Sequence, residues 1–268
     1  QGDVCGVEGR GELGRMINWG MLKERLGHGP HTGTARFTLP SLVLEIEPEF
    51  VVGARLESAR RGLRRVRRVG VRHLERSAVT PHPNRPNLAS PQDLRRVVRE
   101  LVEAVGNGAG GCGLLVPDRA ARVAVISIET LPEDPREADA LIRWRMKASL
   151  PFSAEEARLS YQVLAREPNQ AQVLAVAASH AVLADYESAL EPVNGGATLI
   201  LPATVALLPL LPEGDGAQLL VHVCSGGMTS VVVADHRICS WRTRELAGVV
   251  PEEWHAEVAA EAARILAS

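Results

Sequence analysis

Residues 218–234 read QLLVHVCSGGMTSVVVA, and this stretch decides how the chain is expected to fold. Gln218 to Val223 has the composition of a strand, Ser225-Gly226-Gly227 that of a tight turn, and Thr229 to Ala234 that of a returning strand. The stretch therefore predicts a β-hairpin. Backbone N–H groups at such a turn of small residues can bind phosphate oxygens.

A second strand-turn-strand unit is predicted much earlier in the chain. Leu42 to Ile46 predicts a strand, Pro48-Glu49 a turn, and Val51 to Leu56 the returning strand. Val66 to Leu74 predicts a third strand, in which valines alternate imperfectly with arginines. Because the same unit opens two parts of the chain, we expect a duplicated α/β architecture with a cleft between its halves.

Two helices are predicted between these hairpins from their capping residues. Ser90 caps the first helix and Pro91 occupies its first position, and apolar residues then recur at helical spacing as far as Val105. Asp134-Pro135-Arg136-Glu137 opens the second, which is expected to run to about Ser149. Further strands are expected at 114–117, 121–130, 159–165, 173–178 and 197–201, and helices at 181–190, 202–210 and 251–266.

The composition is that of an ordinary globular protein. Hydrophobic residues make up 46% of the 268 residues and aromatic residues only 3%, so Leu, Val, Ile and Ala must fill the core. The net charge of −2 gives no general attraction to nucleic acid or anionic membranes. No apolar run approaches the ~20 residues of a membrane span, and no signal peptide is evident, so we expect a cytoplasmic location without direct membrane insertion.

The cysteines do not indicate a zinc ribbon or a redox motif. Cys5, Cys112, Cys224 and Cys239 form no C-x-x-C pair, and their scatter suits a reducing compartment. His222 and Cys224 share one face of a predicted strand and could hold a soft metal ion. A packed strand with a hydrogen-bonded histidine is the alternative that we favour.

Ten arginines lie between Arg55 and Arg85. Such a basic segment could bind an acidic partner, although a solvated strand face explains it more simply. The glycine-rich stretch from Asn107 to Gly111 lies between a helix end and a strand, which is the reverse of the order in a P-loop. No hydrolase, zinc-protease or P-loop motif is present in the sequence.

Three stretches, in register over roughly residues 112–165, carry a family resemblance. They are Leu114–Asp118 followed by Ile126–Pro132, the helical segment Leu141-Ile142-Arg143-Trp144, and Leu150–Glu156 running into Leu159–Leu164. Together they resemble the PilM family of type IV pilus assembly proteins. The resemblance implies an actin-like (ribonuclease H-like) α/β fold of two halves, with a small inserted α/β subdomain.

The resemblance also implies a division of the chain. Residues 1–38 are glycine-rich and lack strand or helix periodicity, so their composition predicts a disordered leader or a mis-assigned start. Residues 39–111 would form the first part of the first actin-like subdomain. Residues 112–180 would form the inserted subdomain. Residues 181–268 would complete the first half and begin the second. The glycine-rich turn that contacts adenine in this fold would come later still, so we expect the last part of the fold either to be truncated or to be missing.

The first hairpin departs from the phosphate-binding pattern that the resemblance implies. Glu45 retains the acidic residue of the strand, but Glu47 stands at the glycine position and Pro48 removes an amide donor. Three carboxylates within five residues (Glu45, Glu47 and Glu49) would repel a polyphosphate.

The second hairpin departs from the pattern as well. His222 replaces the acidic residue and Cys224 the first glycine. Magnesium prefers oxygen ligands to imidazole. A vestigial phosphate turn remains, made of Ser225, Gly226, Gly227 and Thr229. We therefore expect no resident cofactor, weak binding of ATP and magnesium at best, and no enzymatic activity.

The resemblance finally implies a partner. In this family the N-terminal cytoplasmic peptide of a PilN-like inner-membrane protein docks between the first and inserted subdomains. Leu115, Val125, Arg143 and Trp144 are the expected groove residues, although Trp144 could equally be ordinary core. The expected function is that of an adaptor of the pilus platform, recruited to the inner face of the inner membrane. The alternatives are an active actin-like ATPase and a GspL-type cytoplasmic component of type II secretion.

Overall fold

The structure is a computed structural model, and it describes residues 40–58, 64–108, 110–212, 216–224, 226–235, 237–246 and 248–267. The strands are β1 (Leu42–Ile46), β2 (Phe50–Ser58), β3 (Arg64–His73), β4 (Cys112–Val116), β5 (Arg122–Ile128), β6 (Ala157–Glu167), β7 (Gln170–Ser179), β8 (Ala197–Pro202), β9 (Gln218–Cys224), β10 (Gly227–Ala234) and β11 (Arg237–Glu245). The α-helices are α2 (Pro91–Val105), α3 (Pro135–Met146), α4 (His180–Ser188), α5 (Ala203–Leu207) and α6 (Trp254–Leu266).

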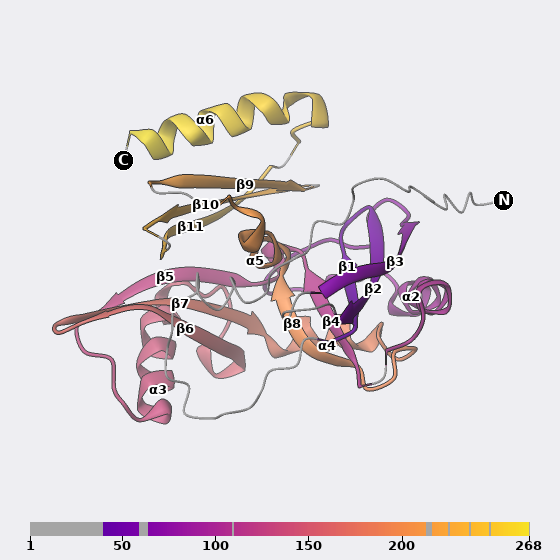
Figure 1. Ribbon diagram of the computed structural model, residues 1–268, viewed down its shortest axis with the longest axis horizontal. Coiled ribbons are helices and arrows are strands. Elements are labelled where there is room, and N and C mark those ends of the chain that lie inside the picture. The colour runs from indigo at the N-terminus through magenta and orange to yellow at the C-terminus, as the bar shows by residue number, and fades with distance from the viewer. Residues whose placement is uncertain are drawn as a thin grey trace.

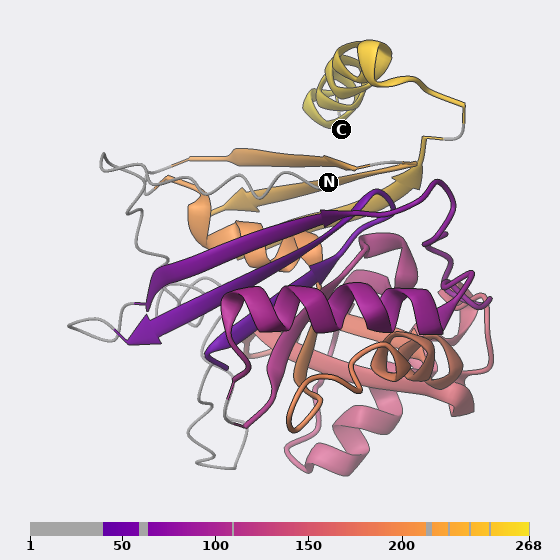
Figure 2. The same ribbon diagram turned by 90° about the vertical axis from the view of Figure 1, so that its right-hand side faces the viewer.

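The first sheet has the strand order β3-β2-β1-β4-β8. The β1–β2 and β2–β3 pairs are antiparallel, as the predicted hairpin requires, whereas β1–β4 and β4–β8 are parallel. Helix α2 lies across one face of this sheet (Figure 2). The contact is close, because a Cβ atom added to Gly53 would lie 2.9 Å from Cγ of Leu101. Glycine in the strand therefore lets the helix approach the sheet.

The second sheet is a three-stranded antiparallel layer with the order β5-β7-β6. Helix α3 packs on one of its faces through a core that includes Ile128, Ile142 and Met146.

The inserted subdomain was expected to begin at residue 112. The structure places β4 in the first sheet instead, and the inserted layer begins with β5. Strand β4 is apolar on both sides because it is a central parallel strand.

The third sheet, β11-β10-β9, lies above the inserted layer in Figure 1, and α6 covers its outer face. Its inner face packs on β5–β7 through a core that includes Val123, Leu174, Val231 and Trp241. The outer face is held to α6 by a buried carboxylate. Glu261 of α6 accepts a hydrogen bond from the Ser230 hydroxyl at 3.0 Å.

The predicted architecture is confirmed in its main features. Both hairpins are present, each opening a sheet, and a third α/β unit is inserted between them. The predicted helix starts are also confirmed, since Ser90 accepts a hydrogen bond from the Asp93 N–H and Asp134 accepts from the Arg136 and Glu137 N–H groups. The expected leader, residues 1–38, lies outside the described part of the chain. Among the described helices, none has the length and apolar character needed to span a bilayer.

Candidate functional site

Asp118 is the centre of a polar cluster between the first and third sheets. It follows β4 directly, in the 3₁₀ turn Asp118–Ala120, and is only 3% exposed. Its Oδ1 atom accepts a hydrogen bond from the Thr204 N–H at 3.0 Å, and its Oδ2 atom accepts one from the Thr204 hydroxyl. Thr204 lies in α5, so this carboxylate ties the end of β4 to the segment that leads into the second half.

His222 brings β9 into the same cluster. Its Nδ1 atom lies 2.8 Å from the Thr204 hydroxyl oxygen and 3.4 Å from Oδ2 of Asp118. Burial alone would lower the pKa of His222, but the hydrogen bond to Asp118 and the negative charge of that residue outweigh it, and Glu47 and Glu45 add to the effect when they are ionised. The pKa of His222 is therefore raised, which favours the imidazolium form and an ion pair between the halves.

Two glutamates of the first hairpin complete the cluster. Glu47 is 3% exposed, and neither of its carboxyl oxygens has a hydrogen-bond partner among the described residues. Burial, followed by the charge of Glu45, raises the pKa of Glu47 to about 8. Burial also raises the pKa of Glu45, although His222 acts in the opposite direction. Glu47 is thus a neutral acid over most of the pH range in which proteins work.

The turn of the second hairpin is in contact with an arginine of the first half. Gly226 has φ = 77°, a conformation that glycine adopts readily, and its carbonyl accepts a hydrogen bond from Arg119 at 3.1 Å. A Cβ atom on Gly227 would lie 2.9 Å from Cδ of Arg119. Arg119 also forms an ion pair with Glu245 at 2.7 Å. The predicted phosphate turn is thus packed against protein on the side of Arg119.

The remaining members of that predicted turn lie in different surroundings. Thr229 is 1% exposed, and its hydroxyl lies 3.0 Å from the hydroxyl of Thr243 on β11. Ser225 lies outside the described residues. Cys224 shares the face of His222, as expected, but burial raises its pKa to about 12, so it remains a thiol. Within the described ranges, no group of three or more His, Cys, Asp or Glu side chains could hold a metal ion.

The residues expected to bind a partner do not line one common groove. Trp144 is 66% exposed on α3, where the Arg145 guanidinium lies 5.5 Å from its ring. Arg143 holds the segment after α3 in place, because its guanidinium donates hydrogen bonds to the Ala154 and Ala157 carbonyls at 2.8 Å. Val125 lies on the other side of the inserted sheet and packs into the core beneath β9–β11. Leu115 is half-buried in β4.

A groove does exist between the first sheet and the inserted layer. We call it the β8 groove. It has a volume of about 490 Å³ and is bounded by β8, α4 and the β6 and β7 strands. Apolar side chains of Leu183, Val176, Leu199 and Leu201 lie along it, and Arg158, Ser160, His180 and Glu187 supply its polar groups. Since β8 and β6 are both edge strands, backbone N–H and C=O groups border this groove.

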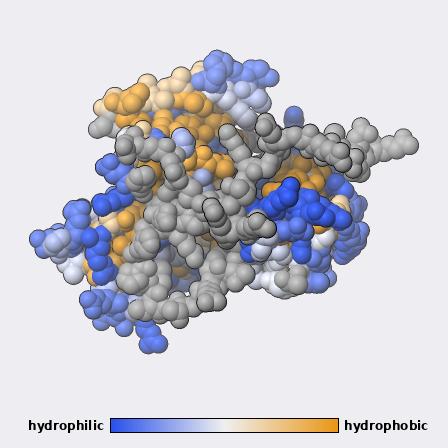
Figure 3. Space-filling model, viewed as in Figure 1, coloured by the Kyte–Doolittle hydropathy of each residue, from blue (hydrophilic) through white to orange (hydrophobic). Residues whose placement is uncertain are grey.

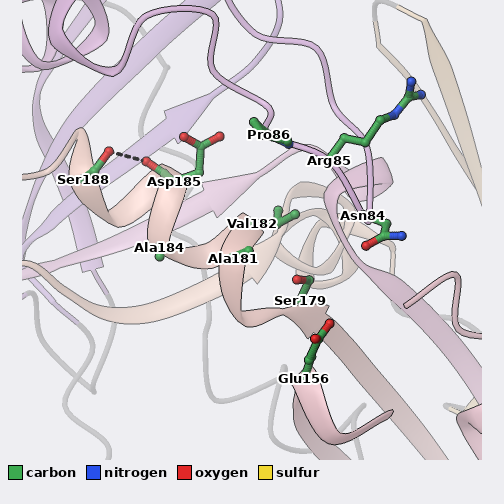
Figure 4. Close-up of a pocket in the computed structure, with 10 residues that line it drawn as sticks. All are labelled: Asn84, Arg85, Pro86, Glu156, Ser179, Ala181, Val182, Ala184, Asp185 and Ser188. Carbon is green, nitrogen blue, oxygen red and sulfur yellow. Dashed lines mark hydrogen bonds between the residues drawn. The ribbon is translucent and has the colours of Figure 1, made fainter. Parts of the chain in front are cut away.

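A second hollow of about 430 Å³, the α4 pocket, lies on the other side of α4. Its wall is formed by the loop Asn84–Pro86, by Glu156 and Ser179, and by α4 (Figure 4). Asp185 accepts hydrogen bonds from the Asn87 and Leu88 N–H groups at 2.7 and 3.0 Å, which fixes this loop against the helix. Ala184 lines both hollows.

Sequence reasoning missed Asp118 and the lining of both hollows. The Pro117-Asp118 end of a buried strand was a usable signal for Asp118, since polar groups at the carboxyl ends of parallel strands commonly face a cleft. The β8 groove had no such signal, because only the strand order makes β8 and β6 edge strands.

Comparisons with known proteins identify the fold. No protein-family model matches the sequence, and no curated protein matches it. The chain is similar to a chain of the PilM-PilN type IV pilus biogenesis complex, with a TM-score of 0.67 and 19% sequence identity over 78% of this chain. The match covers 62% of the length of that chain.

Two further solved structures align over most of the chain. A Bacteroides thetaiotaomicron protein of unknown function with an actin-like ATPase fold gives a TM-score of 0.51 and 10% identity over 90% of this chain and 80% of that one. The cytoplasmic domain of EpsL, an inner membrane component of the type II secretion system of Vibrio cholerae, gives 0.45 and 12% identity over 76% of this chain and 70% of that one. The chain therefore has the actin-like ATPase fold of the Bacteroides thetaiotaomicron protein, and it shares its overall fold with the chain of the PilM-PilN complex.

Proposed function

We propose that this chain is a cytoplasmic adaptor of a type IV pilus assembly platform, and that it binds the N-terminal peptide of a PilN-like inner-membrane protein. The β8 groove is the observation that supports this function. It combines an apolar floor with two sheet edges, which is the chemistry that an extended peptide with leucine side chains requires. The fold shared with a chain of the PilM-PilN complex agrees with this role.

We further propose that the chain works without nucleotide hydrolysis. An ATP-magnesium complex needs donors at both hairpin turns and a free carboxylate near them. Here Arg119 packs against the second turn, His222 engages Asp118, and the buried Glu47 stands where the first turn would need a glycine. These residues do not fit the phosphates. The polar cluster instead joins the two halves of the adaptor.

A peptide titration tests the adaptor function. The probe is a fluorescein-labelled peptide from the cytoplasmic N-terminus of a PilN-like inner-membrane protein, and the readout is fluorescence anisotropy. We expect micromolar affinity for the intact chain. Ala184→Arg, which places a long charged side chain beside both hollows, should abolish binding, because Ala184 lines each of them.

Two variants then separate the β8 groove from the other candidate surfaces. Leu183→Glu places a charge in the β8 groove alone and should weaken binding at least tenfold, whereas Trp144→Ala, on the exposed face of α3, should leave it unchanged. Loss of binding in Trp144→Ala together with full binding in Leu183→Glu would move the site to α3. No binding by the folded chain would reject the adaptor function itself.

A further inference from the structure

The free edge of the first sheet carries two chemically different faces. Strand β3 is the outermost strand at this side and, among the described strands, pairs only with β2. It is ten residues long, so one full row of its backbone N–H and C=O groups faces outward. The opposite edge of the same sheet is β8, which borders the β8 groove.

A β-bulge changes which side chains of β3 lie on the same face of the sheet. The strand pairs Arg68 with Arg55 but Val66 with Leu56, so that Arg67 is the extra residue. Because the extra residue shifts the alternation by one position, Val66 lies on the same face of β3 as Val69 and Val71. The regular alternation of a strand would have placed Val66 on the other face.

The opposite face of β3 carries arginines. Arg72 points toward α2, since its Nε lies 3.7 Å from a carboxylate oxygen of Glu100 on that helix. Gly70 lies on this face too, because a Cβ atom there would lie 2.8 Å from Leu101. The pairing register places Arg68 and Arg65 on this face as well, and both side chains are exposed. Neither takes part in an ion pair within the described part of the chain.

The valine face is exposed to an unusual extent. Val66, Val69 and Val71 are 43%, 58% and 46% exposed, and they make up three of the seven large hydrophobic residues that the described chain exposes. The surface over β1–β3 shows a hydrophobic area next to a strongly hydrophilic one (Figure 3). Arginines and a bulge are devices that keep sheet edges from pairing with copies of themselves, but they do not account for three exposed valines.

We infer that the β3 edge is a second docking site, and that its ligand is an acidic, extended segment in which apolar and acidic residues alternate. Such a segment would add to the sheet as a sixth strand. Its apolar side chains would lie beside Val69 and Val71, and its carboxylates would lie beside Arg65 and Arg68. A second copy of this chain does not fit, because pairing of β3 with itself would bring arginine against arginine.

This site goes beyond the proposed function, because it lies at the opposite edge of the sheet from the β8 groove. An adaptor with one site at each edge could hold the pilus-type peptide and a separate acidic partner at the same time. The two sites share no residue, so the β3 edge can be tested independently of the β8 groove.

The test uses a nine-residue, fluorescein-labelled peptide that alternates valine and glutamate, titrated with the full chain at neutral pH and low salt. We expect saturable binding that weakens as salt is added. Arg68→Glu should weaken it about tenfold, since a cross-strand attraction is replaced by a repulsion of similar size. Arg136→Glu, an equal change of charge at an exposed position of α3, should have no effect.

Further variants distinguish strand addition from simple charge attraction. Val69→Thr keeps the shape and strand propensity of the residue but removes an apolar group, and should also weaken binding. A peptide with proline at its central positions, which lacks amide donors there, should not bind. Equal binding by the proline peptide, by Arg68→Glu with native circular dichroism, or by a valine–lysine peptide would overturn the inference. So would self-association of the chain that Val69→Thr abolishes.

Discussion

The Nδ1 atom of His222 lies 3.4 Å from Oδ2 of Asp118, across 104 residues of sequence. The pair joins β9, in the second half, to the end of β4 in the first sheet. The hydroxyl of Thr204 lies between them and contacts both side chains. The contact therefore links the two sheets, and the first prediction tests it.

We expect Asp118→Asn to lower the pKa of His222. The substitution removes the charged acceptor that raises this pKa and leaves the burial that lowers it. The imidazole resonances of His222, followed by NMR through a pH titration, provide the measurement. Asp139→Asn, on α3 and away from the cluster, should not change this pKa. An unaltered His222 titration in Asp118→Asn would refute the pairing.

Glu47 should make the protein less stable as the pH rises. Its folded pKa of about 8 lies above the ordinary value of 4.5, so between these values the unfolded chain ionises while the folded chain keeps its proton. Stability attributable to this group is therefore present below pH 4.5 and is lost as the pH approaches 8. The buried amide of Glu47→Gln carries no such penalty.

The measurement is the unfolding free energy in urea at pH 5 and at pH 9. We expect the stability of Glu47→Gln relative to the native protein to be greater at pH 9 than at pH 5, by about 4 kcal/mol. Glu49→Gln, at an exposed position of the same turn, should show no such change. A pH-independent difference for Glu47→Gln would mean that the carboxyl is not buried in its neutral form.

Glu261 should be the main polar anchor of α6. It is fully buried, accepts a hydrogen bond from Ser230, and lies 3.7 Å from both Arg242 and Arg244. Glu261→Gln removes the charge that compensates these arginines and should cost about 2 kcal/mol of unfolding free energy. Glu257→Gln, which alters a partly exposed ion pair with Arg244, should cost less than about 1 kcal/mol. Equal losses in urea unfolding would contradict this assignment.

ATP with magnesium should bind weakly at best. Isothermal titration calorimetry of the isolated chain should show no micromolar affinity, because the second turn packs against Arg119 and Thr229 is buried against Thr243. A phosphate-release assay should show no turnover above that of the buffer. Micromolar binding that Thr229→Ala or Glu45→Gln abolishes would restore the ATPase alternative.

Local patterns sufficed to predict most elements of the structure. The two hairpins were predicted from apolar strands that flank Pro48-Glu49 and Gly226-Gly227. The helix starts were predicted from the capping residues Ser90 and Asp134. Each of these features depends on residues a few positions apart, so the sequence contains them directly. The family resemblance marked Glu47 and His222 as departures from a phosphate-binding pattern and Glu45 as the acidic residue that is retained, and all three lie in one polar cluster.

The side of a sheet or helix on which a given side chain lies was harder to predict than the helices and strands themselves. Trp144 and Val125 were expected on one groove, yet they lie on opposite sides of the inserted sheet. A one-residue bulge at Arg67 placed three valines on one face, where simple alternation predicts two. Faces depend on register and on what packs against a strand, and neither is encoded in a short window of sequence.

The sequence by itself determined the two hairpins and the helix caps, because each depends on short-range backbone preferences. Only the tertiary structure decided that β4 joins the first sheet, that Asp118 meets His222, and that β8 and β3 are the outermost of the described strands in one sheet. These relations follow from strand order, which is set by the packing of apolar faces from distant segments into common cores.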